Sequence, residues 1–124
     1  MDKYPVFSLE INKSETTFKN VDEIINYLKD LVQAHPIATY ISIFDHYTHT
    51  ASLADGEISP EIKDAKNLIF CFGKQILNPK ILAVRPRSIG ICELQNSFTI
   101  DLLEAPNEQL HKTIEKWAKS VANK

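Results

Sequence analysis

The first clear pattern in the chain is the alternation of apolar and polar residues in VFSLEI, residues 6–11. Apolar side chains at every second position share one side of an extended backbone, which predicts a half-buried strand. The polar residues 12–15 then predict a turn into a short second strand, TTFK, at residues 16–19.

The apolar spacing becomes helical after Asn20. Apolar residues recur every three or four positions until Pro36, which cannot continue a helix. Asn20 is a suitable N-cap, and Glu23 stands three residues after it, as in a capping box. We therefore predict a helix over residues 21–34, with an apolar stripe formed by Val21, Ile24, Ile25, Leu28, Leu31 and Val32.

The middle of the chain has mainly the composition of extended structure. Residues 38–48 are rich in β-branched and aromatic side chains and apolar on both faces, which predicts a central strand. An Asp-Gly pair then marks a loop, and Ser59-Pro60 predicts the start of a short helix that ends at about Lys66. Residues 67–73 fit either a helical stripe or a buried strand, and we choose the strand.

The last third of the chain predicts strands followed by a closing helix. Asn78-Pro79 marks a turn, extended apolar runs stand on both sides of Pro86, and a hairpin turns at Gln95-Asn96. Pro106 opens a helix whose apolar stripe is formed by Leu110, Ile114, Trp117, Ala118 and Val121.

These elements together predict an α+β fold. We expect one mostly antiparallel sheet of about five or six strands, with the two long helices packed on one face. The chain has 124 residues, of which 44% are hydrophobic, enough for a core without disulfide or metal staples. Residues 1–124 are therefore predicted to form a single α+β domain.

Two further features bear on the compartment. No apolar run approaches the roughly 18 residues that a membrane span needs, and the N-terminus lacks the pattern of a signal peptide. Cys71 and Cys92 stand in apolar stretches, which is typical of buried free thiols in a reducing compartment. We expect a cytoplasmic protein with no membrane partner; a disulfide between the two cysteines requires neighbouring strands.

Charge is unevenly distributed. Residues 65–92 contain no acidic residue, whereas the remainder of the chain carries nine basic and sixteen acidic groups. An anionic partner is thus expected at this segment, and binding of nucleic acid over the whole surface is disfavoured. Its five basic residues are Lys66, Lys74, Lys80, Arg85 and Arg87.

Within the basic segment, AVRPRSIG (residues 83–90) has the features of an anion site. Proline stiffens the backbone between Arg85 and Arg87, and Ser88 adds a hydroxyl group. We predict that these three residues, with Lys74, bind a carboxylate or phosphate. The alternative is that both arginines form ion pairs with the acidic remainder of the molecule.

The other chemically rich stretch is FDHYTHT, residues 44–50. On a strand, His46 faces away from His49, so the two imidazoles chelate one ion only if the strand ends near Asp45. Asp45 and His49 on one face are candidates for an oriented general base, and Cys71 is a candidate nucleophile. We predict no resident metal or cofactor.

Function is not identified by any motif, since no phosphate loop, CxxC pair or nucleophile elbow is present. We favour a non-catalytic domain that binds an anionic small molecule or partner through residues 66–87. One alternative is a metal-binding or acid/base enzyme centred on Asp45, His46 and His49. Another is a homodimeric interaction module that pairs sheet edges.

Overall fold

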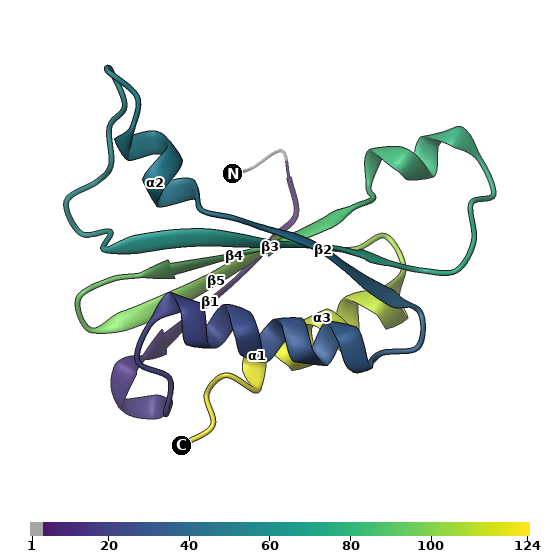
Figure 1. Ribbon diagram of the computed structural model, residues 1–124. Helices are drawn as coiled ribbons and strands as arrows, with labels where there is room; N and C mark the ends of the chain where they lie inside the picture. The colour runs from purple at the N-terminus through teal and green to yellow at the C-terminus, as the bar shows by residue number, and fades with distance from the viewer. Residues whose placement is uncertain (1–3) are drawn as a thin grey trace.

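The computed structural model describes residues 4–124 and shows one antiparallel sheet of five strands, in the order β1-β5-β4-β3-β2. The chain starts at one edge, crosses to the other through a helix, and returns through three successive antiparallel neighbours (Figure 1). The predicted α+β fold class is confirmed. The strands are β1 (Val6–Asn12), β2 (Ala38–Phe44), β3 (Asp64–Phe72), β4 (Arg87–Glu93) and β5 (Ser97–Leu103).

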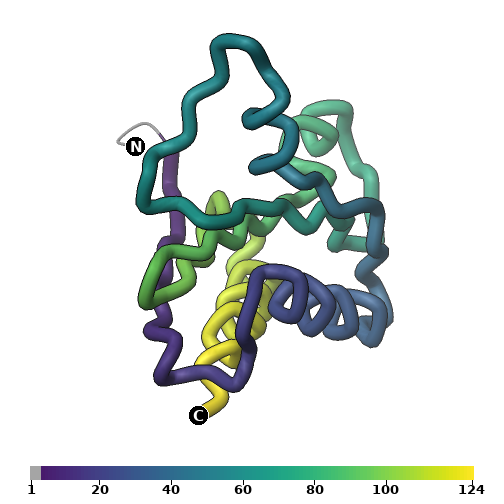
Figure 2. Tube along the Cα trace, turned by 60° about the vertical axis from the view of Figure 1, so that its left-hand side comes forward, coloured from purple at the N-terminus to yellow at the C-terminus, as the bar shows by residue number. Residues whose placement is uncertain are grey.

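Both long helices lie on the same face of the sheet, as predicted. Helix α1 (Val21–Ala34) and helix α3 (Glu108–Lys119) run below the sheet in Figure 1. The short helix α2 (His46–Ala51) and the 3-10 turn η2 (Pro79–Ala83) stand on the opposite side, where Figure 2 also places them. A further 3-10 turn, η1 (Lys13–Glu15), follows β1.

The core lies between the sheet and the two long helices. Leu28 of α1 is fully buried, and Trp117 of α3 packs its ring 5.5 Å from that of Phe72 and 6.2 Å from that of Phe70. The apolar stripes predicted for both helices therefore face the sheet. The strand residues buried beneath them include Ile11, Leu68, Phe70, Phe72, Ile89, Ile91, Phe98, Ile100 and Leu102.

The predicted strand at residues 16–19 is wrong. β1 instead pairs along its whole length with β5, from Val6 opposite Leu103 to Asn12 opposite Ser97. The segment after it is held by side-chain contacts, since the Asn123 Oδ1 accepts a hydrogen bond of 2.8 Å from the Thr17 N–H. β1 therefore pairs with the distant strand β5 instead of forming the expected hairpin, and a local sequence pattern does not reveal such a distant partner.

The strand predicted for residues 38–48 ends at Phe44, and it is an edge strand rather than a central one. The Asp45 carboxylate accepts a hydrogen bond of 2.9 Å from the Thr48 N–H and so caps α2. An aspartate that satisfies the first free amides of a helix outweighs the β-rich composition that follows it.

Two other boundaries also differ from expectation. No helix forms before Lys66, because β3 already begins at Asp64, opposite Glu93 of β4. The run before Pro86 is not extended but contains η2, whose N-cap is Asn78. The strand chosen for residues 67–73 and the β4–β5 hairpin are confirmed.

Candidate functional site

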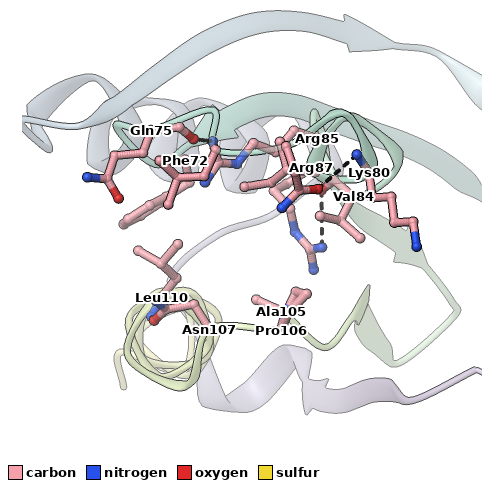
Figure 3. Close-up of a pocket in the computed structure, with 13 residues that line it drawn as sticks. Phe72, Gln75, Lys80, Val84, Arg85, Arg87, Ala105, Pro106, Asn107 and Leu110 are labelled. Carbon is pink, nitrogen blue, oxygen red and sulfur yellow. Dashed lines mark hydrogen bonds between the residues drawn. The ribbon is translucent and has the colours of Figure 1, made fainter.

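A cavity of about 470 Å³ opens between residues 74–87 and the start of α3. Three of the five cations of the basic segment line it, namely Lys80, Arg85 and Arg87, and we call it the arginine cavity. In Figure 3 the Arg87 side chain extends into the space above Ala105 and Pro106. Phe72 and Leu110 face one another at the other end.

Arg87 reaches the cavity because it opens β4 on the helix-facing side of the sheet. Buried residues alternate along this strand, and Arg87 shares its face with Ile89 and Ile91. Its side chain therefore points towards α3 rather than into solvent. Only 9% of Arg87 is exposed, which is unusual for an arginine.

The Arg87 guanidinium has only neutral partners among residues 4–124. Its Nη1 donates a hydrogen bond of 3.4 Å to the Val84 carbonyl, and its Nη2 donates to the Leu103 carbonyl. The Nε is buried and has no hydrogen-bond partner in this part of the chain. Burial lowers the pKa of Arg87, and the cavity therefore contains a poorly compensated positive charge.

Arg85 occupies the outer part of the cavity and is half-buried. Its Nη1 donates a hydrogen bond of 2.5 Å to the Gln75 carbonyl, and its guanidinium lies against Gly73. Gly73 has a φ of 136°, and a β-carbon there would stand 2.3 Å from the Arg85 Nη2. Glycine is thus required at this position both for the turn and for the placement of Arg85.

The other two predicted anion ligands lie elsewhere. Ser88 points to the opposite side of the sheet, where its Oγ accepts a hydrogen bond of 2.9 Å from the Asn67 Nδ2. Lys74 is exposed and does not line the cavity. Lys80, a cation outside the predicted ligand set, lines the cavity from η2.

Lys66 is engaged within the protein at the far end of β3. Its ammonium group bonds to the Asp22 carboxylate, and lies 3.8 Å from that of Asp45 and 4.0 Å from that of Asp64. The hydrogen bond with Asp22 is the main reason why the pKa of Lys66 is raised. This cation is therefore not available to an anionic partner.

The acid/base and metal candidates are not assembled into a site. Asp45 binds the amide of its own helix, and the rings of His46 and His49 pack 5.2 Å and 5.6 Å from that of Phe44. The strand-based argument for separating the two histidines is wrong, because β2 ends before them. Among residues 4–124, no group of three or more His, Cys, Asp or Glu side chains is placed to hold a metal ion.

The capping role of Asp45 gives a pH-dependent prediction. Replacing Asp45 by alanine should lower the free energy of unfolding by about 1 kcal/mol at pH 7, through loss of the cap. The hydrogen bond from the Thr48 N–H is the largest cause that lowers the pKa of Asp45, so the charged carboxylate stabilises the folded state above its ordinary pKa. That contribution should disappear as the pH falls through the lowered pKa.

Urea unfolding of the wild type, Asp45→Ala and Asp45→Asn at pH 7 and at about pH 2.5 tests this prediction. Asparagine keeps the capping acceptor and removes the charge, so its deficit at pH 7 should be small and should vanish in acid. An Asp45→Asn deficit that is independent of pH would contradict the electrostatic part.

The two cysteines are free thiols in the structure. Cys71 and Cys92 lie on the neighbouring strands β3 and β4, but Cys92 stands opposite Ala65, six residues from Cys71. That offset separates them by roughly 20 Å, far beyond the reach of a disulfide. Burial raises the pKa of the Cys92 thiol. Cys71 and Lys66 face opposite sides of β3, and Lys66 is held by aspartates.

Fold and cavity together define a small α+β domain with a basic, apolar-walled cavity at one end of its sheet. The chain belongs to a family of unknown function, DUF6858, whose sequence profile matches residues 1–123. Neither the comparison with curated proteins nor that with solved structures gave a match.

Residues 4–124 contain no helix with the length and apolar character needed to cross a membrane.

Proposed function

We propose that this protein binds a small organic anion in the arginine cavity and does not transform it. The observation that carries the proposal is the Arg87 guanidinium, a cation that is nine-tenths buried and whose Nε has no hydrogen-bond partner among residues 4–124. A buried charge is stable when an opposite charge accompanies it, and arginine is well suited to bind a carboxylate or phosphate.

The alternative of internal ion pairs finds no support in the contacts of this site. None of the ion pairs formed among residues 4–124 includes Arg85 or Arg87. Their hydrogen bonds go to the main-chain carbonyls of Gln75, Val84 and Leu103 instead. Both guanidiniums therefore keep capacity for a bound anion.

The composition of the cavity wall favours binding over catalysis. Apart from Lys80 and the two arginines, its polar side chains are the amides of Gln75, Asn78 and Asn107. None of these is a customary nucleophile or general base. The free thiols of Cys71 and Cys92 support a cytoplasmic location as part of the same proposal.

A thermal-shift screen at two salt concentrations tests this function. The probes are acetate, inorganic phosphate, citrate and a nucleotide, each compared with chloride at equal ionic strength. We expect at least one anion to raise the unfolding temperature at both salt concentrations, because a ligand that binds only the folded state stabilises it. Attraction without a shaped site should fade with added salt.

The matched variants separate the cavity from the general charge of the segment. Replacing Arg85 and Arg87 together by alanine should abolish the anion-dependent shift. Lys74→Ala, which removes an exposed cation of the same segment, should keep it. A shift that survives in the double variant, or no selective anion at all, would refute the proposed function.

Pairing of sheet edges between two copies is the second proposal. It is favoured by the position of β2 at an edge, with Ile41 and Phe44 exposed along it. A break in the β2–β3 register between Tyr40 and Ser42 opposes long, regular pairing of that edge with a second copy. Sedimentation at several protein concentrations tests edge pairing, since a monomer at every concentration would exclude a dimer.

A further inference from the structure

The walls of the arginine cavity are mainly apolar, although three cations line it. Arg87 is the deeply buried one, whereas Arg85 is half-buried and Lys80 is exposed. A ligand there meets one desolvated positive charge next to a hydrocarbon surface. The apolar residues of the wall are Phe72, Leu77, Ile81, Val84, Ala105, Pro106 and Leu110.

A second cavity, of about 460 Å³, adjoins the first. Its lining includes His35, Ile37 and Thr113, and it shares Phe72 and Leu110 with the arginine cavity. The two cavities therefore meet at the Phe72–Leu110 pair, which Figure 3 shows face to face on the side away from Lys80. An elongated molecule would have to pass over this pair to occupy both cavities.

The outer wall also carries apolar surface that is not covered by the protein itself. Leu77 lines the arginine cavity and yet 76% of it is exposed. Exposed aliphatic side chains at the rim of a cavity gain free energy when a ligand covers them. This surface adds to the apolar contact available to a ligand held at Arg87.

We infer that the ligand is an amphipathic carboxylate, that is, a monoanionic head group on an extended apolar body. The inference rests on the proposed function and specifies its ligand class. The carboxylate binds at Arg87, and the apolar body runs over Phe72 and Leu110 towards the second cavity. A single negative charge matches the single buried guanidinium, whereas a dianion would bring a second charge into apolar surroundings.

A series of straight-chain carboxylates tests the inference. Acetate, butyrate, hexanoate, octanoate and decanoate, all below their micelle concentrations, are titrated by calorimetry at fixed pH and salt. Each methylene added to the chain buries apolar surface, so Kd should fall by about fourfold per methylene until the cavities are filled. Octanol should bind at least about tenfold more weakly than octanoate, because it lacks the charge that Arg87 binds.

Fluorescence gives an independent readout. Trp117 is the single tryptophan of the chain, and its ring lies 5.5 Å from that of Phe72, which lines both cavities. Octanoate should change its emission, and acetate should change it much less, because only the longer molecule reaches Phe72 while its head group is at Arg87.

A matched pair of variants locates the apolar body. Leu110→Gln should reduce the fall in Kd with chain length, while acetate binds as before. Leu82→Gln, at an exposed position outside both cavities, should leave the Kd values of all the carboxylates unchanged. If Leu110→Gln does not fold, the series on the wild type decides alone.

Failure of the inference differs from failure of the proposed function. If short anions bind in an Arg85- and Arg87-dependent way but Kd does not fall with chain length, the inference is wrong and the proposed function stands. If octanol binds as tightly as octanoate, the head-group assignment is wrong. If no anion of any length binds, both proposals fall.

Discussion

Replacing Leu28 by alanine should lower the free energy of unfolding by about 2–5 kcal/mol, and Trp117→Ala should have an effect of similar size. Leu28 has no exposed surface, and Trp117 is 9% exposed between α3 and the aromatic residues of β3. Truncation removes apolar contacts and leaves a cavity that tightly packed neighbours fill only in part. Denaturant unfolding followed by circular dichroism measures both losses.

Leu82→Ala provides the control, because this side chain is largely exposed on η2. Its unfolding midpoint should stay close to that of the wild type, since surface substitutions usually change stability by less than about 0.5 kcal/mol. If neither Leu28→Ala nor Trp117→Ala lowered the unfolding midpoint, the apolar faces of α1 and α3 would not form the core.

The sequence reveals the helices well because their signals are local. The spacing of Val21, Ile24 and Leu28 and the cap at Asn20 are sufficient to place α1, and the structure begins and ends that helix where the pattern does. The α3 stripe is equally clear, although the helix is capped by Asn107 and begins at Glu108 rather than at Pro106. Each of these features lies within a few residues of the element that it defines.

Strand pairing could not be derived in the same way. β1 and β5 are joined by backbone hydrogen bonds between residues about ninety positions apart. No sequence feature near residues 6–12 indicates which strand is the partner. The edge position of β2 likewise follows from the order of the whole sheet. At Asp45 a local signal was present, because an aspartate three residues before a free amide is a cap, but the β-rich composition concealed it.

The candidate site was predicted in part. Arg85 and Arg87 line one cavity, and anion binding by them stays a prediction, whereas the strand alternation that turns Arg87 inward places Ser88 on the opposite side of the sheet. Adjacent residues on a strand face opposite sides, so Arg87 and Ser88 could share a site only outside β4. The sequence could not predict that Lys80 and the start of α3 line the cavity, because this depends on the path of residues 74–87 in three dimensions.

The second large effect is expected at Lys66, whose side chain is 16% exposed and lies between three aspartates. Replacing Lys66 by methionine should lower the free energy of unfolding by about 2 kcal/mol at pH 7. Methionine keeps the apolar stem but leaves the carboxylates of Asp22, Asp45 and Asp64 without their shared cation. The loss should stay below that of a fully buried pair, because the aspartates are partly exposed and solvent screens them.

The pH dependence of this effect has a defined sign. The pKa of Lys66 is raised in the folded state, mainly by the hydrogen bond with Asp22, so the folded protein holds this proton more tightly than the unfolded chain. Its contribution to stability is complete below the ordinary lysine pKa of about 10.4 and is lost as the pH rises through the higher folded value. The difference in stability between wild type and Lys66→Met should therefore shrink in alkaline solution.

Lys63→Met is the matched control, since Lys63 is exposed three residues away and forms no ion pair within residues 4–124. It should unfold like the wild type at every pH, whereas Lys66→Met should approach the wild type only above pH 10. Equal losses in the two variants would show that lysine number, and not the aspartate cluster, sets the stability. Lys66 contacts an aspartate at the start of α1, the cap of α2 and the first residue of β3. A loss of stability confined to Lys66→Met would therefore show that the ion pairs of this cluster stabilise the packing of those three elements.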